Sequence, residues 1–517
     1  MDEHQDMDLD NSLKLIAKSS IIVFIGVILS KILTYIYRII IAINYGPEIY
    51  GVFSLALMVL GWFVIFSRMG LPEGLNRYIP FYRGKSDKNK IKFIIKRTTK
   101  IISLMGVISG IVLFFSAKFI AINLFNSPQL TLFLKIFAII VPFYVLFDTY
   151  LVILIAYEKV GWRSFIFNIL QNLVRLLALI IFIYIGFSIN AIAVSYIIGS
   201  LVGLVTAYFA CKFLTKQAFG KYNLSKSEKK ETFKNLFSYS WPLLFFGIIF
   251  SIFHWTDTLI IGLFTNAKQV GFYNAAVPIA MLLTFSSQIF IQLFFPFITR
   301  QYSKDKKNIK AINQLSKQIS KWIFIINLPI LILILIFPGV FINLLFKSQY
   351  LVAENALRFL SIGALFSSIF IVSNNLISMI GKSKVILIDI IIASVINIFL
   401  NVILVQSHGI TGAAFATMVS LIVLNTLFLI HAKKYLSIVP LRRKMITIAF
   451  VTLIPTILLL LIRSKTPNIN FLTMILLGFM FGLSYIILLF LTKSLDKNDM
   501  LILNAILKKL RINKTEK

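Results

Sequence analysis

The sequence predicts an all-α polytopic membrane protein with about fourteen transmembrane helices, and three observations support this fold class. First, the chain of 517 residues is 59% hydrophobic and only 14% charged. Second, apolar runs of about 20 residues, the length that crosses a bilayer, recur from end to end. Third, lysine and arginine gather in alternate connections between these runs, as expected when alternate loops face the cytoplasm.

The predicted helices can be placed from the apolar runs. Because Lys14 and Lys18, before the first predicted helix, and the tail from Lys493 both fall on the basic side of this alternation, we expect both termini in the cytoplasm of a multi-pass protein of the cell (plasma or inner) membrane. The formal net charge of +33 then reflects topology and attraction to anionic lipid, with no nucleic-acid partner implied. The helices are expected near residues 15–44, 50–70, 93–116, 130–156, 162–185, 189–212, 236–263, 271–299, 320–345, 354–380, 384–405, 409–432, 445–463 and 470–492.

The second half of the chain repeats the first. Residues 45–53 align with 265–273, and 189–193 align with 410–414 at nearly the same offset. Each repeat holds six predicted helices, and an even number returns the chain to its starting side, so we expect parallel lobes related by a pseudo-twofold axis along the membrane normal. The predicted organisation is an N-lobe (1–215), a cytoplasmic linker (216–235), a C-lobe (236–434), two C-terminal helices (435–492) and a basic amphipathic cytoplasmic tail (493–517).

The first predicted helix carries charge in its interior. Lys31, Tyr35 and Arg38 fall on one stripe of this helix, because a helix advances about 100° per residue. A charge at the bilayer centre costs roughly 2.5–3.5 kcal/mol on insertion scales, so such residues normally face a bundle interior or a wet cavity. We therefore predict a cationic cavity that receives an anion; the alternative for Arg38 is a side chain that extends to the interface.

A third deep cation lies on the fifth predicted helix. Arg175 shares a polar stripe with Asn168, Gln171 and Asn172, at intervals of three and four residues. Guanidinium groups bind phosphate in a bidentate manner, so we predict a phosphate-binding cavity formed by Lys31, Arg38, Arg175 and Tyr35. For the amides, interhelical hydrogen bonds are the alternative. The further polar residues expected around this cavity are Asn168, Gln171, Asn172, Arg68, Lys135, His254 and Asn374.

Three carboxylates lie within predicted helices: Asp148, Asp257 and Asp389. Carboxylates inside membrane helices can pair with cations or bind a coupling proton or sodium ion, and these three are candidates for either role or for hydrogen bonds to a sugar. The single cysteine, Cys211, rules out a cysteine-based metal cluster, and the four histidines have no zinc-binding spacing. We expect no metal, no cofactor and no catalytic residue.

Two segments resemble a known family. YGPEIYGVFSLAL begins at Tyr45, and RMGLPEGLNRYIPFY begins at Arg68 and leads into a basic loop. With the two six-helix repeats and two extra helices, this pattern resembles the multidrug/oligosaccharidyl-lipid/polysaccharide (MOP) exporter superfamily, in its polysaccharide transporter or oligosaccharide flippase (Wzx-like) branch.

The resemblance implies a V-shaped pair of lobes that works by alternating access and is not an enzyme. It implies translocation of a polyprenyl- or dolichyl-(pyro)phosphate-linked oligosaccharide to the outer leaflet, for surface polysaccharide or glycan biosynthesis. The implied partners are this substrate and membrane lipids, with other glycan-assembly membrane proteins left open, and we expect a monomer. The family's cationic lumen maps onto Lys31, Arg38 and Arg175 by helix number and depth alone.

Two other functions are weighed against flipping. An ion-coupled multidrug exporter of the same fold generally has an acidic residue in the first-lobe cavity, and the first predicted helix has none. A membrane polysaccharide polymerase or ligase needs a large outer loop with catalytic groups, and every predicted outer connection is short. Both features favour the flippase.

Overall fold

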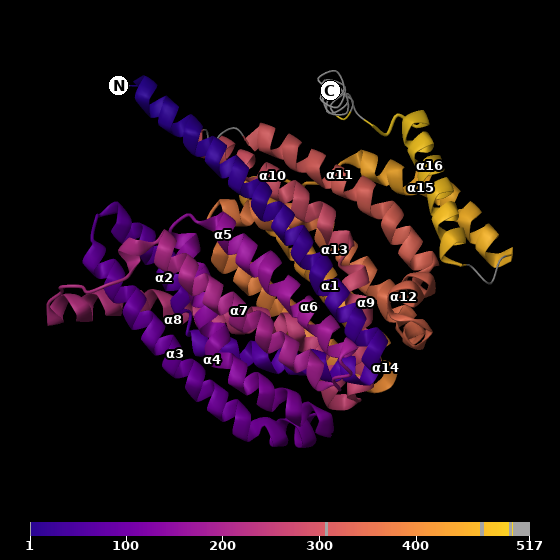
Figure 1. The fold of residues 1–517 in the computed structure, drawn as a ribbon. Helices are drawn as coiled ribbons and strands as arrows, with labels where there is room; N and C mark the ends of the chain where they lie inside the picture. The colour runs from indigo at the N-terminus through magenta and orange to yellow at the C-terminus, as the bar shows by residue number, and fades with distance from the viewer. Residues whose placement is uncertain (1, 305–308, 466–469, 496–498, 500–517) are drawn as a thin grey trace, which may run out of the picture. The chain divides into compact units, whose positions relative to one another are not determined.

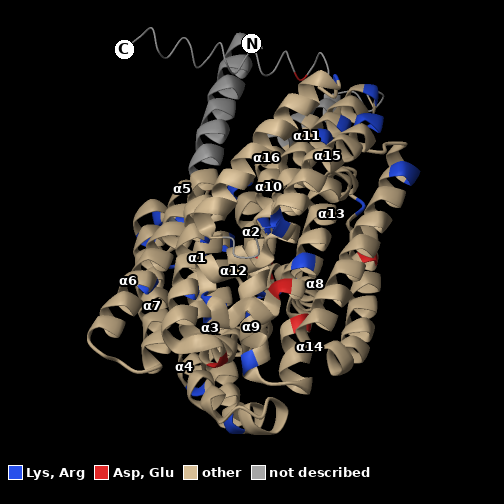
Figure 2. Cartoon of the chain, turned by 90° about the vertical axis from the view of Figure 1, so that its right-hand side faces the viewer, with Lys and Arg blue, Asp and Glu red and all other residues tan. Residues whose placement is uncertain are grey.

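The computed structural model describes residues 2–304, 309–465, 470–495 and 499, and all regular elements of these residues are helical (Figure 1). The chain forms two compact units: unit 1 consists of residues 1–278 and 390–417, and unit 2 of residues 279–389 and 418–517. In the whole chain lysine and arginine, 52 together, outnumber aspartate and glutamate, 19 together (Figure 2). In chain order the elements are α1 (Asp2–Arg68), α2 (Leu71–Gly84), α3 (Lys88–Phe119), the π-helix η1 (Ile120–Leu124), α4 (Pro128–Ala156), α5 (Val160–Ser164), the π-helix η2 (Phe165–Leu170), α6 (Gln171–Tyr184), α7 (Asn190–Leu214), the 3-10 helix η3 (Lys216–Ala218), α8 (Lys226–Phe264), α9 (Ala267–Ala280), α10 (Leu283–Lys304), α11 (Ile309–Ile336), α12 (Pro338–Phe346), the 3-10 helix η4 (Ser348–Ala353), α13 (Glu354–Met379), α14 (Ser383–Leu436), α15 (Arg443–Lys465) and α16 (Phe471–Leu491).

Eleven helices of the described residues are long and apolar enough to cross a membrane, or up to twelve if α9 and α10, bent by 46°, form one span. The fold is therefore that of an all-α, multi-pass membrane protein. The count of twelve is two lower than the fourteen predicted spans because α1 and α14 are each counted once, although one glycine divides each into two helical parts. Gly46 (φ 78°) interrupts α1 and Gly409 (φ 55°) interrupts α14, and only glycine adopts such angles freely.

In unit 1, α3 packs along α4, and α7 packs against α4 and α6 (Figure 1). The second part of α1 crosses α9 at two glycines. A Cβ at Gly51 would overlap the carbonyl oxygen of Ala267, and one at Gly271 would overlap that of Pro47. Small residues permit this close approach of two membrane helices. The contact joins the two segments that the sequence aligns as repeats.

In unit 2, α15 and α16 pack on α11. Ile336, the last residue of α11, and Phe337, which follows it, share a buried cluster with Leu459 of α15 and Phe481 of α16. The hydroxyl of Tyr485 also donates to the carbonyl oxygen of Ile325 at 3.1 Å. The two predicted C-terminal helices are thus integral parts of unit 2.

The predicted linker (216–235) is shorter in the structure. After η3, α8 begins at Lys226, where Ser225 and Glu228 form a reciprocal capping box that satisfies the first backbone donors. The division into two six-helix lobes stays a prediction. Of the predicted tail, only residues 493–495 and 499 are among the described residues.

Candidate functional site

Two arginines from distant parts of the chain line one cavity of about 280 Å³ within unit 1. Arg38 comes from α1 and Arg175 from α6. In the described part of the chain, no carboxylate lies within 4 Å of either guanidinium group. The aromatic lining residues that bear a polar atom are Tyr37, Tyr144, Tyr196 and Trp255. The cavity therefore combines positive charge with hydrogen-bonding rings.

Arg175 is held by packing. Its Cζ atom lies 3.7 Å from the ring centroid of Tyr196, a cation–π contact. Its Nε atom is buried without a hydrogen-bond partner. Gly199 of α7 permits this arrangement, because a Cβ there would lie 3.0 Å from both the Cβ of Arg175 and the carbonyl oxygen of Gln171. The guanidinium thus stacks on an aromatic ring, and no carboxylate among the described residues compensates its charge.

Tyr37 forms a rigid part of the cavity wall. Its side chain is 3% exposed, and its hydroxyl donates to the carbonyl oxygen of Ile192 at 3.0 Å. The same hydroxyl lies 3.0 Å from the Oγ atom of Ser195. These bonds fix α1 against α7 beside Arg38 and Arg175. No sequence pattern singled out Tyr37, Tyr144, Tyr196 or Trp255, because aromatic residues are common on membrane helices.

The predicted stripe on α1 only partly faces this cavity. Arg38 lines it together with Thr34 and Tyr37. Lys31 and Tyr35 are half-buried and do not belong to its lining. The face turned to the cavity is therefore rotated from the predicted one, since Tyr37 takes the place expected for Tyr35.

Of the three amides next to Arg175, only Asn172 donates to a described side chain outside the span Val160–Tyr184. Asn168 donates to the Oγ atom of Ser164 at 2.9 Å, and Asn172 donates to the Oγ atom of Ser30 on α1 at 3.0 Å. Gln171 is 2% exposed, and its Nε2 atom has no hydrogen-bond partner. None of the three lines the cavity. One reason is the π-helix η2, which contains Asn168 and breaks the α-helical spacing that would align it with Arg175.

Arg68 and Asp148 pair with each other. The Nε atom of Arg68 lies 3.0 Å from Oδ2 of Asp148, and its Nη2 atom lies 2.6 Å from Oε1 of Glu73. Lys135 is exposed, with Nζ 5.5 Å from the ring centroid of Phe114. The cations predicted at the edges of the cavity therefore lie outside its lining.

Asp257 of α8 is surrounded by neutral donors. Asn401 donates to its Oδ1 atom at 2.9 Å, Thr417 lies 2.7 and 2.6 Å from its two oxygens, and the hydroxyl of Tyr273 also donates to it. In the described residues of unit 1, no lysine or arginine lies within 4 Å of this carboxylate. His254, one turn earlier, is exposed, with its ring 5.3 Å from that of Trp255.

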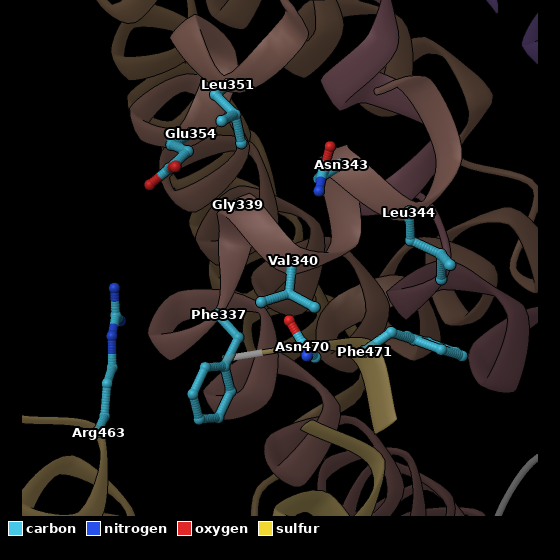
Figure 3. A pocket seen from close by; sticks show the side chains of 10 residues that line it. All are labelled: Phe337, Gly339, Val340, Asn343, Leu344, Leu351, Glu354, Arg463, Asn470 and Phe471. Atoms are coloured by element: carbon cyan, nitrogen blue, oxygen red, sulfur yellow. The ribbon is translucent and has the colours of Figure 1, made fainter. Parts of the chain in front are cut away.

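Two predicted residues belong to unit 2. Asp389 is fully buried, with Oδ2 2.9 Å from Nδ1 of His431, and Asn374 is half-buried on α13. Unit 2 also holds a cavity of about 430 Å³, whose lining includes Arg463 and Glu354 (Figure 3). The Oε2 atom of Glu354 lies 3.7 Å from the Nη2 atom of Arg358. This cavity therefore carries both signs of charge, unlike the cavity of unit 1.

Metal-binding chemistry has no support in these arrangements. In the described part of the chain, no group of three or more histidine, cysteine, aspartate or glutamate side chains could hold a metal ion. The function therefore has to be sought in the cationic cavity and in the relatives of the chain.

Comparison with known proteins supplies the family. The model for "Polysaccharide biosynthesis protein" matches residues 16–302, more than half of the chain, and the MatE model matches residues 242–403. Over 272 residues the chain is 29% identical to the probable low-salt glycan biosynthesis flippase Agl15 of Haloferax volcanii, covering 52% of this chain and 56% of that protein. Over 377 residues it is 24% identical to the putative O-antigen transporter of Shigella flexneri, covering 71% and 86%.

A solved structure shares the fold. The lipid II flippase MurJ in an inward closed conformation superposes with a TM-score of 0.70 at 18% identity, covering 90% of this chain and 98% of that one. This likeness concerns the fold alone. The match to the family model over more than half of its length shows that the chain belongs to the polysaccharide biosynthesis protein family, a flippase (Wzx-like) family of membrane transporters in the MOP superfamily, and is not an enzyme.

Proposed function

We propose that this protein is a flippase that moves a polyprenyl- or dolichyl-(pyro)phosphate-linked oligosaccharide from the cytoplasmic to the outer leaflet by alternating access. The observation that carries the proposal is the cavity with Arg38 and Arg175, whose charges no described carboxylate compensates. An anion that enters apolar surroundings needs paired, hydrogen-bonded partners. The names of the relatives in Haloferax volcanii and Shigella flexneri support a glycan cargo.

In this proposal the two guanidinium groups replace the water that the phosphate loses. Each offers a planar fork of donors that matches phosphate oxygens. Tyr37 and Tyr196 exclude water at their sides, which strengthens the electrostatic attraction. Lys31, two turns before Arg38 on α1, would attract the phosphate on its way to or from this site.

The proposal includes a membrane topology. If α9 and α10 together form one span, and if each part of α1 and α14 on either side of Gly46 and Gly409 crosses the membrane separately, the chain has fourteen spans, with both termini in the cytoplasm. The lobes would then be residues 1–215 and 236–434. The glycine contact between residues 45–53 and 265–273 supports this arrangement, because repeats related by a pseudo-twofold axis meet at that axis.

Asp257 is our candidate for the coupling ion site. A carboxylate that has only neutral partners, as here with Asn401, Thr417 and Tyr273, can take up a proton or a sodium ion without first breaking an ion pair. Asp148 is a weaker candidate, because it already pairs with Arg68.

The test uses cells that depend on this protein for their surface glycan. The variant Arg38→Gln/Arg175→Gln should abolish surface glycan and leave lipid-linked saccharides on the cytoplasmic side. The matched control is Lys135→Gln, which removes an exposed cation of the same unit. Normal export by a well-expressed double variant would contradict the proposal, as would raised resistance to cationic dyes on expression of the wild-type chain.

A further inference from the structure

A second basic pocket lies on unit 1, apart from the arginine cavity. It has a volume of about 620 Å³, within the usual range of small-molecule sites, and lies between α3, α4, α7 and the segment after η3. Its charged lining residues are Lys92, Lys96 and Lys100 of α3 and Lys221. None of its lining residues lines the arginine cavity.

Three of the four lysines come from one face of α3, and two tyrosines line the pocket with them. Lys92, Lys96 and Lys100 are spaced by four residues and so lie on one face of α3. The opposite wall contains Tyr150 of α4 and Tyr208 of α7, whose ring centroids are 5.5 Å apart.

The segment after η3 closes the pocket over these lysines. Ala218 is 1% exposed and anchors it, and Gly220 turns it with a φ of +121°. A Cβ at Gly220 would lie 3.8 Å from the Nζ atom of Lys92. Lys92 is half-buried against this segment, whereas Lys96, Lys100 and Lys221 of the lining are exposed and accessible to a ligand.

The positive charge of this pocket is uncompensated by the described residues. Its lining contains no carboxylate, and no described carboxylate lies within 4 Å of any of its four lysines. The neighbouring Lys90 shows the contrast, because its Nζ atom lies 3.2 Å from Oδ2 of Asp87. Four like charges held together repel one another, so an anion that binds among them relieves this repulsion.

One side of the pocket is continuous with lipid-facing surface. Ile95 and Leu146 belong to its lining. Beyond Ser103, α3 exposes a row of large apolar side chains, each 44% exposed or more: Leu104, Val107, Ile108 and Ile111. An anion with an apolar tail could therefore place its charge among the lysines and its tail along α3.

We propose that this pocket binds the phosphate headgroup of an anionic lipid from the surrounding bilayer. Basic pockets between membrane helices on the cytoplasmic side are typical headgroup sites. In the topology proposed above, this end of α3 faces the cytoplasm. The lipid would hold the segment after η3 against α3 and α4, and its binding does not depend on what the protein transports.

The test measures lipid binding by the full-length protein in neutral detergent. Short-chain phosphatidylglycerol is titrated, and bound lipid is counted by native mass spectrometry. Each lysine near an anionic surface contributes about fivefold to affinity, so Lys92→Gln/Lys96→Gln/Lys100→Gln should weaken the first binding event about a hundredfold. The control, Lys226→Gln/Lys230→Gln/Lys234→Gln, removes three exposed lysines at the same spacing on α8 and should leave binding unchanged.

Two further arms identify the ligand. Inorganic phosphate at the same concentration should fail to displace the lipid, and displacement would overturn the assignment to a lipid. In the wild-type chain, which avoids any folding defect, bound phosphatidylglycerol should protect Lys92, Lys96 and Lys100 from acetylation while Lys226 and Lys230 still react. Equal loss of binding in both triple variants, or equal acetylation of both sets, would overturn the proposal.

Discussion

The arginine cavity of unit 1 and the buried Lys321 of unit 2 are two different solutions for a cation inside a membrane protein. Lys321 is fully buried, with Nζ 2.5 Å from Oδ2 of Asp499, which also accepts from Trp322 at 2.6 Å and from Gln318. Arg38 and Arg175 line a cavity and have no such carboxylate among the described residues. The difference teaches that a cation with its own counter-ion stabilises the fold, whereas one without it is available to a ligand.

The largest expected effect tests the paired side of this comparison. Lys321→Gln should lower the free energy of unfolding by about 3–5 kcal/mol, because it leaves the buried carboxylate of Asp499 uncompensated. Denaturant titration of the purified protein in detergent measures this change. The double variant Lys321→Gln/Asp499→Asn should recover much of the loss. A loss below about 1 kcal/mol in the single variant would mean that the pair does not stabilise unit 2.

The next effect concerns the packing that positions Arg175. Gly199→Ala should cost about 1–3 kcal/mol, because the added Cβ would press on the backbone and Cβ atoms of α6 at 3.0 Å. Thermal unfolding of the purified protein measures this loss of stability. The comparison variant is Ala178→Gly on α6, which reports how much a change in helix propensity alone alters stability. An unchanged Gly199→Ala variant would show that α6 and α7 can separate without cost.

A smaller effect, of the same order as the one expected for Arg175, is expected for Asn172. Asn172→Ala removes the hydrogen bond to Ser30 between the α6 segment and α1, and such interhelical bonds contribute about 0.6 kcal/mol on average in membrane proteins. Stability should fall by this order, while glycan export continues. Complete loss of export in a stable Asn172→Ala protein would contradict this expectation and show that Asn172 takes part in transport.

A small stability effect is also expected for Arg175 itself. Arg175→Gln breaks no ion pair within the described residues, so we expect the free energy of unfolding to change by less than about 1 kcal/mol. Export should nevertheless be lost. If Arg175→Gln severely destabilised the protein, Arg175 would be a structural cation like Lys321. The contrast between the paired cation of unit 2 and the cations of the arginine cavity would then be wrong.

The sequence predicted the fold class and the two arginines but not the cavity walls. Length, apolar runs and the alternation of basic loops predicted the multi-pass helical fold, because the bilayer imposes them directly. The cost of a buried charge singled out Arg38 and Arg175. Which face of α1 meets the cavity depends on how the helices pack, so Tyr35 was predicted where Tyr37 lies.

Other features depend on contacts between distant residues. The π-helix η2 changes the facing of Asn168, and no pattern in FIFNIL predicts it. The partner of Asp148, Arg68, lies on another helix far away in the sequence. Lys321 ends a basic stretch and resembles any loop lysine, since only folding brings Asp499 beside it.

The central claim is that Arg38 and Arg175 bind the phosphate of a lipid-linked saccharide. The most direct measurement is the affinity of the purified protein for a polyprenyl-pyrophosphate-linked saccharide, compared between the wild-type chain, Arg38→Gln/Arg175→Gln and Lys135→Gln. Because charge-assisted hydrogen bonds contribute about 1.5–3 kcal/mol each, the double variant should bind at least about a hundredfold more weakly. Lys135→Gln should bind as the wild type does. Equal affinity of all three proteins would contradict the account.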